Sequence, residues 1–273
     1  MPDDRLKVAL GQMRVGPRAE DNLRRCMALM RRAASEGARL IVLPEGVIAR
    51  DPADPALCAR RAERLDGPFV EGLLEASRGI PVAVACTVHV LPRDAGGKVS
   101  NVHLVAQGGK LLAAYRKLHL YDAFASRESD TVEAGREVPP LVEIDGWRLG
   151  LMTCYDLRFP ELARRLALDG ADALVVPAAW ERGPLKESHW ELMARARALE
   201  NTVYVLAVSE VSAQNIGCSM AVDPLGVAVA RAGGGSEAFL TAELSREALR
   251  QARLALPVLA NRRFRAPELA SGE

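Results

Sequence analysis

Long apolar runs are missing from this sequence. Nowhere do about 18 consecutive apolar residues occur, so we expect no transmembrane helix. The first residues, MPDDRLKVAL, are charged and lead directly into a strand-like segment. They lack the basic and then apolar layout of a secretory signal. These two absences predict a cytosolic protein.

Cysteine is sparse, and it is not arranged for cross-linking or metal binding. The five cysteines are an odd number, lie far apart and include no C-x-x-C pair, and the four histidines are not clustered. We therefore expect neither a disulfide framework nor a zinc site. A phosphate-binding P-loop is also missing, because the glycines at 233–235 lack the lysine and the helix start that such a loop needs.

An excess of one charge is absent as well. Lysine and arginine number 36 and aspartate and glutamate number 35. This balance does not favour nucleic acid or an anionic membrane as a partner, so a small molecule becomes the default. No Pro/Ser-rich linker, low-complexity tract or block of like charge marks a boundary. We predict one domain over residues 1–273, with 256–273 as a C-terminal tail.

Short β-branched runs alternate with longer helical patterns, which is typical of a layered α/β protein. Because many of the strands are apolar throughout, we expect two facing sheets with helices outside, although periodicity leaves the strand order open. Strands are predicted at 7–13, 39–45, 81–91, 100–107, 110–120, 172–180, 202–210 and 238–243, with a hairpin around 145–146 and two strands around 223–226. Helices are predicted at 19–36, 68–78, 159–170, 187–200 and 245–254.

Three reactive side chains, Glu45, Lys117 and Cys154, lie at or just after predicted strand ends, where α/β proteins gather functional groups. A thiol needs a nearby base or cation to become a nucleophile. Glu45 could be that base if burial raises its pKa. Lys117 and the backbone N–H of Tyr155 could then stabilise the oxyanion formed by attack on an amide. These groups are sufficient for acyl transfer through a thioester.

Each of these residues also has a plainer interpretation. An isolated cysteine after an apolar strand is more often a buried structural residue. Glu45 and Lys117 could each be a solvated charge, and a Cys-His pair is a further, weaker arrangement. The polar segment at 155–161 favours the reactive interpretation, since a structural cysteine does not need it.

Three segments resemble, in order, the signature segments of the nitrilase (carbon–nitrogen hydrolase) superfamily. They are LIVLPEG at 40–46, YRKLHLYD at 115–122 and GLMTCYDLRFPELAR at 150–164. The likeness extends over essentially the whole chain. It implies a four-layer α-β-β-α sandwich that pairs through its helices into a homodimer, and chemistry that requires no metal or organic cofactor.

The same resemblance implies a role for each catalytic candidate. Glu45 corresponds to the general base, Lys117 to the cation at the oxyanion and Cys154 to the nucleophile. Glu128, in the loop after the lysine, corresponds to a second glutamate that holds the lysine and assists proton transfer. His119, two residues after Lys117, is expected to make a supporting hydrogen bond near the lysine loop rather than to be catalytic.

Within the superfamily, the chain most resembles the deaminated glutathione amidases, with the ω-amidases as near relatives. That resemblance implies hydrolysis of the amide between a 2-oxoglutaryl group and cysteinylglycine. 2-Oxoglutaramate is the alternative substrate, a catalytically silent binding or regulatory member is the alternative of another class, and an acyltransferase is a further one.

Three residues are candidates for contacting such a substrate, in addition to Tyr155. Arg158 could bind a substrate carboxylate, or it could pair with Asp156 or Glu161 to hold the turn. Trp180 and Phe124 could line the pocket or belong to the core.

Overall fold

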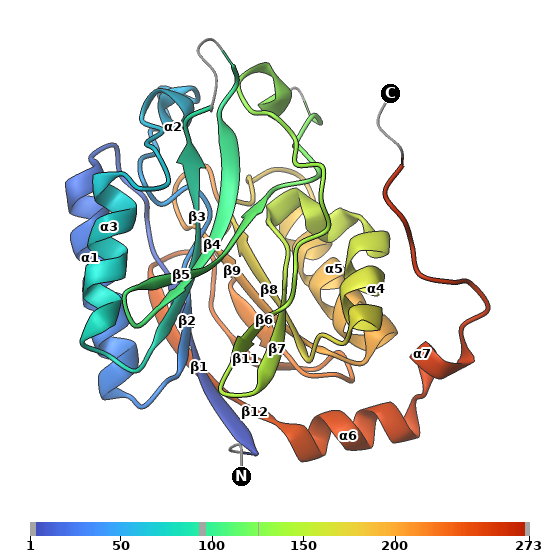
Figure 1. Cartoon of the computed structure of the whole chain (residues 1–273). Helices are drawn as coiled ribbons and strands as arrows, with labels where there is room; N and C mark the ends of the chain where they lie inside the picture. The colour runs from blue at the N-terminus through green and yellow to red at the C-terminus, as the bar shows by residue number, and fades with distance from the viewer. Residues whose placement is uncertain (1–3, 93–96, 125, 271–273) are drawn as a thin grey trace.

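Two six-stranded sheets lie face to face between layers of helices (Figure 1). The computed structural model describes residues 4–92, 97–124 and 126–270. In spatial order the first sheet contains β12 (Ala238–Ser245), β1 (Arg5–Gln12), β2 (Leu40–Val42), β3 (Ala83–Val90), β4 (Ser100–Gln107) and β5 (Lys110–Arg116). The second contains β11 (Ala228–Arg231), β10 (Met220–Val222), β9 (Tyr204–Ser209), β8 (Ala173–Ala178), β7 (Trp147–Leu151) and β6 (Val142–Ile144). In each sheet three neighbouring strands are parallel and the others are antiparallel.

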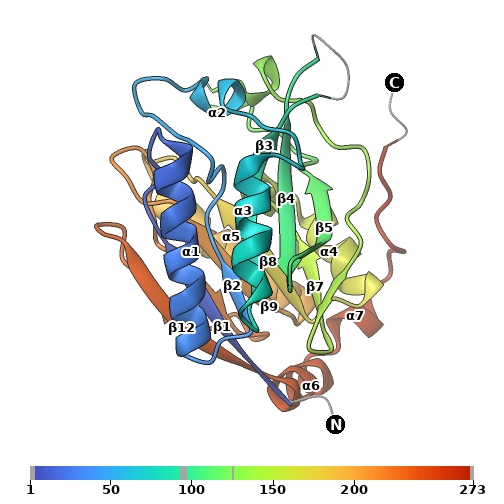
Figure 2. The same cartoon turned by 60° about the vertical axis from the view of Figure 1, so that its left-hand side comes forward.

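Helices cover both outer faces of the sandwich. α1 (Ala19–Ser35) and α3 (Pro68–Arg78) lie on the first sheet, while α4 (Pro160–Asp169) and α5 (Lys186–Asn201) lie on the second, as Figures 1 and 2 show from two sides. The four-layer α-β-β-α sandwich is therefore confirmed. The remaining short or terminal elements are α2 (Leu57–Arg60), α6 (Arg246–Ala255), α7 (Val258–Asn261) and the 3₁₀ turns Glu128–Asp130 and Cys154–Arg158.

The core has two parts because side chains alternate between the faces of each strand. Along β1, Val8 and Leu10 pack in the cluster shared with the second sheet. Ala9 packs in the cluster beneath the helices, together with Met30 of α1 and Leu73 of α3. Strands buried on both faces in this way read as unbroken apolar runs in the sequence.

β2 and β5 end well before their predicted ends, and both ends shape the site. β2 stops at Val42, so Glu45 lies beyond it. β5 stops at Arg116 instead of residue 120 because the following N–H groups leave the sheet. The Leu118 N–H donates to Tyr115 Oη at 3.0 Å, and the His119 N–H donates to Asp156 Oδ1 at 3.1 Å. Lys117 therefore begins a connecting segment that side chains hold in place.

The C-terminal segment leaves the sandwich after α6. Beyond α7 the chain runs without regular structure along the side of α4 (Figure 1), where Arg165 Nη1 donates to the Pro267 carbonyl at 3.2 Å. All five cysteines are free. Over residues 4–92, 97–124 and 126–270, no helix combines the length and the apolar character needed to cross a membrane.

Candidate active site

Glu45, Lys117, Glu128 and Cys154 come from four separate segments and meet at one end of the facing sheets. Lys117 Nζ lies 2.7 Å from Glu128 Oε2 and 3.1 Å from Glu45 Oε1. The Glu45 carboxylate is also close enough to the Cys154 thiol for its charge to raise the pKa of that thiol. The structure thus brings the four predicted catalytic candidates together.

Glu45 links the two sheets at this point. The Ala179 N–H, just after β8, donates to its Oε2 at 2.8 Å, and the Glu45 N–H donates to the Ala178 carbonyl at 3.2 Å. Gly46 follows with a φ of 68°, which lets the chain turn away at once. The Gly46 N–H then donates to Thr87 Oγ1 at 2.8 Å. The carboxylate accepts from the Ala179 N–H on one oxygen and from Lys117 Nζ and Asn101 Nδ2 on the other, which fixes its orientation.

Cys154 begins a tight turn with a φ of 45°, a left-handed conformation that is unusual for a residue with a side chain. Buried Asp156 fastens the turn. Asp156 Oδ2 accepts the Thr153 N–H at 2.8 Å and the Tyr115 hydroxyl at 2.9 Å. Because Tyr115 lies two residues before Lys117, the Asp156 carboxylate joins the Cys154 turn to the lysine segment.

His119 also belongs to this junction. Its Nδ1 lies 2.8 Å from Asp156 Oδ1, and its ring stacks on Phe159 with a centroid separation of 3.7 Å. The prediction of a supporting hydrogen bond near the lysine loop is therefore confirmed.

The charges in the site correct one expectation. Burial raises the pKa of Glu45, but the positive charges of Lys117 and Arg50 outweigh it and lower that pKa to about 2. The condition considered for Glu45, that burial raises its pKa, is therefore not met, because these cations outweigh burial. Burial and the Glu45 charge raise the pKa of the Cys154 thiol well above its ordinary value. Burial opposes the Lys117 charge, yet Glu128 and Glu45 raise the pKa of Lys117. The resting site therefore contains a carboxylate base, an ammonium and a neutral thiol.

A pocket of about 810 Å³ opens over these groups. All eight residues predicted for the site line it: Glu45, Lys117, Phe124, Glu128, Cys154, Tyr155, Arg158 and Trp180. Trp180 is also buried against Trp190, with the ring centroids 5.1 Å apart, so it serves both the pocket and the core. Phe124 is 66% exposed, and its assignment to the core is therefore wrong.

Arg158 points its guanidinium among aromatic rings. Its Cζ lies 4.9 Å from the Trp180 ring centroid and 5.8 Å from that of Tyr155. Within the described chain it forms no ion pair, and its Nε and Nη2 are buried without a hydrogen-bond partner. The alternative in which Arg158 pairs with Asp156 or Glu161 is wrong, since Asp156 already binds Tyr115, His119 and Thr153.

Sequence reasoning missed three residues of the site. Asn101, the second residue of β4, donates from Nδ2 to Glu45 Oε1 at 2.8 Å and to Glu128 Oε1 at 3.2 Å. Because β4 also contains Ser100, His103 and Gln107, nothing in its sequence distinguishes Asn101. Asp156 was considered only as a partner for Arg158. Lys186 lines the pocket from the start of α5, where the sequence resembles an ordinary helix terminus.

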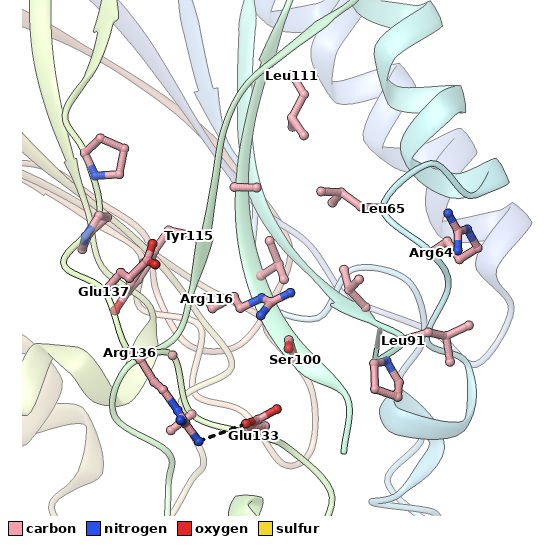
Figure 3. Close-up of a pocket in the computed structure, with 18 of the residues that line it drawn as sticks. Arg64, Leu65, Leu91, Ser100, Leu111, Tyr115, Arg116, Glu133, Arg136 and Glu137 are labelled. Atoms are coloured by element: carbon pink, nitrogen blue, oxygen red, sulfur yellow. Dashed lines mark ion pairs between the residues drawn. The ribbon is translucent and has the colours of Figure 1, made fainter. Parts of the chain in front are cut away.

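A second pocket, of about 800 Å³, lies along the outer side of β4 and β5 (Figure 3). Arg116 of β5 and Glu133 and Arg136 of the next segment line it, and Figure 3 shows the ion pair between the last two. Its lining includes none of the eight predicted site residues. The chemistry therefore belongs to the first pocket.

Comparisons with known proteins agree with this geometry. The family model described as carbon-nitrogen hydrolase matches residues 7–254. A deaminated glutathione amidase of Escherichia coli O157:H7 is 47% identical over 264 residues, which cover 96% of this chain and 99% of that protein. A deaminated glutathione amidase of Mus musculus is 35% identical over 274 residues, covering 94% of this chain and 83% of that one. The crystal structure of Saccharomyces cerevisiae Nit3, a member of branch 10 of the nitrilase superfamily, matches with a TM-score of 0.83 and 31% identity, covering 95% and 97% of the two chains.

Proposed function

This chain belongs to the carbon–nitrogen hydrolase family, and on that basis we propose that it hydrolyses deaminated glutathione to 2-oxoglutarate and cysteinylglycine. The main support for a substrate with a carboxylate is the unpaired Arg158 guanidinium in the pocket that contains Cys154. A planar guanidinium matches a carboxylate through two parallel hydrogen bonds. The 2-oxoglutaryl group offers such a carboxylate at the end opposite its amide.

The reaction begins with proton transfer from Cys154 to Glu45 as the sulfur attacks the amide carbon. The transfer has to accompany the attack, because the raised pKa of the thiol leaves little thiolate beforehand. Lys117 and the Tyr155 N–H stabilise the tetrahedral oxyanion. Glu45 then gives the proton to the departing amine, which leaves an acyl thioester on Cys154.

Hydrolysis of the thioester completes the cycle. Glu45 takes a proton from a water molecule, which attacks the thioester carbonyl, and Lys117 stabilises the second oxyanion in the same position. Glu128 keeps Lys117 in place throughout, since it accepts from Lys117 Nζ at 2.7 Å and from the Tyr121 N–H at 2.7 Å. The thiol is regenerated when Glu45 returns its proton.

A comparison of substrates tests the proposal. Catalytic efficiency would be measured on deaminated glutathione, 2-oxoglutaramate and a carbamoyl amino acid, with the Cys154→Ala variant as the control without a nucleophile. We expect deaminated glutathione to be preferred and a thioester adduct on Cys154 to be detected by mass spectrometry. Preference for 2-oxoglutaramate would make the protein an ω-amidase, and preference for the carbamoyl compound would overturn the substrate class. Full turnover by Cys154→Ala would overturn the mechanism.

The proposal includes a cytosolic homodimer in which each chain forms one domain with its tail at 256–273. Exposed apolar side chains support the dimer: Leu192 and Leu199 of α5 are exposed, as are Leu225 and Val227 of the β10–β11 turn. The turn packs against α5, because Arg195 Nε donates to the Gly226 carbonyl at 2.8 Å. Apolar patches of this kind mark association surfaces. Light scattering should show a dimer, and Leu192→Asp should shift it to monomer while exposed Leu254→Asp does not.

A further inference from the structure

Lys186 is a buried cation that the mechanism above does not use. The residue is only 4% exposed at the start of α5, and it lines the pocket that contains Cys154. Its Nζ donates to Tyr121 Oη at 2.7 Å and lies 4.0 Å from the centroid of the Phe124 ring. It forms no ion pair within the described part of the chain. Burial lowers the pKa of Lys186, and the exposed carboxylate of Glu181 opposes that shift without forming an ion pair with Lys186 among the described residues.

The second unpaired cation of this pocket, Arg158, lies nearby. Its Cζ is 5.9 Å from the centroid of the same Phe124 ring, so the two cations share one aromatic neighbour. The positive charges of Arg158 and Lys186 are close enough for the first to lower the pKa of the second. Two like charges in one pocket repel each other, and an anionic ligand placed between them would remove that cost.

We propose that Lys186 and Arg158 form a subsite for a 2-oxo carboxylate, in which Lys186 recognises the 2-oxo group of the acyl chain. This inference rests on the proposed function and deepens it. Arg158 offers a planar fork to the carboxylate, while Lys186 offers a compact ammonium donor to the adjacent oxo oxygen. The subsite therefore distinguishes a 2-oxo acid from a simple carboxylic acid.

The same two charges act against amino acids. An α-ammonium in place of the 2-oxo group cannot accept a hydrogen bond from Lys186, and it would face two cations that no protein carboxylate neutralises by contact. Selectivity gained by such repulsion does not require any additional contact to the preferred substrate. We therefore expect the site to reject amides of glutamate and to accept the corresponding deaminated compounds.

A structural role for Lys186 is the competing explanation. Its hydrogen bond to Tyr121 could hold the loop whose Tyr121 N–H binds Glu128, and Glu128 holds Lys117. Loss of that support would weaken catalysis for every amide by a similar factor. A loss confined to 2-oxo substrates distinguishes recognition from support.

The test compares three amides of equal chain length, 2-oxoglutaramate, glutaric acid monoamide and L-glutamine, in wild type, Lys186→Gln and Lys186→Arg. A hydrogen bond to a charged group predicts that Lys186→Gln lowers kcat/KM for 2-oxoglutaramate by about 10- to 100-fold. The same substitution should change kcat/KM for glutaric acid monoamide only a few-fold. For L-glutamine, kcat/KM should rise relative to the values for both other amides. Lys186→Arg, which keeps the charge, should retain part of the preference. Lys110→Gln removes an exposed lysine of β5 outside this pocket and should change none of the ratios.

A binding measurement separates this inference from the proposed function. Calorimetry would compare 2-oxoglutarate with glutarate on the Cys154→Ala protein and on Cys154→Ala carrying Lys186→Gln, which needs no turnover. Tighter binding of 2-oxoglutarate, lost with Lys186→Gln, supports the subsite even if deaminated glutathione is not hydrolysed. Equal affinities on the Cys154→Ala protein, or equal losses for all amides in Lys186→Gln, would overturn it.

Discussion

Asn101 Nδ2 donates to Glu45 Oε1 at 2.8 Å, so a residue of β4 orients the carboxylate proposed as the general base. Asn101 also contacts Lys117 through its main chain, because its backbone carbonyl accepts the Lys117 N–H at 2.9 Å. The same Nδ2 reaches Glu128 Oε1 at 3.2 Å. One side chain thus sets the spacing of both carboxylates around the lysine.

Replacing Asn101 by alanine should lower kcat far more than it changes KM. The variant keeps the backbone hydrogen bond to Lys117 but loses the side-chain donor to both carboxylates. Loss of a hydrogen bond to a charged group costs about 1.5–3 kcal/mol, which corresponds to a decrease in kcat of roughly 10- to 100-fold. Steady-state kinetics on the preferred amide checks this, with exposed Asn261→Ala as the matched control. An unchanged kcat in a folded Asn101→Ala protein would remove this positioning role.

Glu45→Gln should separate the ionisation of the nucleophile from turnover. Amide hydrolysis should fall by at least about 10²-fold because the proton acceptor is lost. The Glu45 charge raises the pKa of Cys154, so its removal should lower that pKa and increase the thiolate fraction at pH 8. Alkylation by iodoacetamide, followed by mass spectrometry of Cys154, should therefore become faster. Slower alkylation together with lost turnover would mean that Glu45 activates the thiol even without substrate.

Arg158→Met should weaken the use of carboxylate-bearing amides. Loss of a charged donor predicts a decrease in kcat/KM of about 10- to 100-fold, mostly through KM. Arg127→Met is a demanding control, because Arg127 lines the same pocket but pairs with Asp130 at 3.6 Å. Equal losses in the two variants would show a general effect of positive charge and not a carboxylate contact.

The layers of the fold could be predicted from the sequence because apolar runs are local signals, and the structure brings the four catalytic candidates together as expected. Apolar runs mark β1 and β8, whereas the segments around Glu45, Lys117 and Cys154 became informative only when they were taken together and in order. Asn101 and Lys186 act through neighbours far away in the chain, so no local pattern marks them. The lowered pKa of Glu45 could not be predicted for the same reason, since it depends on Lys117, 72 residues away in the sequence.

The stability of the protein should depend on pH through Glu45. Its pKa is about 2 in the folded protein and 4.5 ordinarily, so the folded state binds this proton less readily than the unfolded state. The stabilisation is complete above about pH 4.5 and is lost as the pH falls towards 2. The free energy of unfolding measured with urea should differ between wild type and Glu45→Gln by a constant amount from pH 7 to about pH 5. The difference should become smaller below that pH. A difference that shrank between pH 7 and pH 5 would contradict the lowered pKa.

Gly135 controls the position of Lys117 from outside the sheet. Its N–H donates to the Lys117 carbonyl at 2.7 Å, and a Cβ at this glycine would lie 2.2 Å from the Arg116 carbonyl oxygen. Gly135→Ala therefore has to displace the backbone of Arg116, directly before Lys117. We expect a destabilisation of about 1–3 kcal/mol, typical of overpacking, and a lower kcat.

Gly79→Ala is the matched control, because nothing lies within 4 Å of a Cβ there and its φ of −93° suits alanine. Thermal unfolding and kinetics on both variants measure the effect, and a Gly135→Ala protein that behaves like Gly79→Ala would show that the close approach does not constrain Lys117.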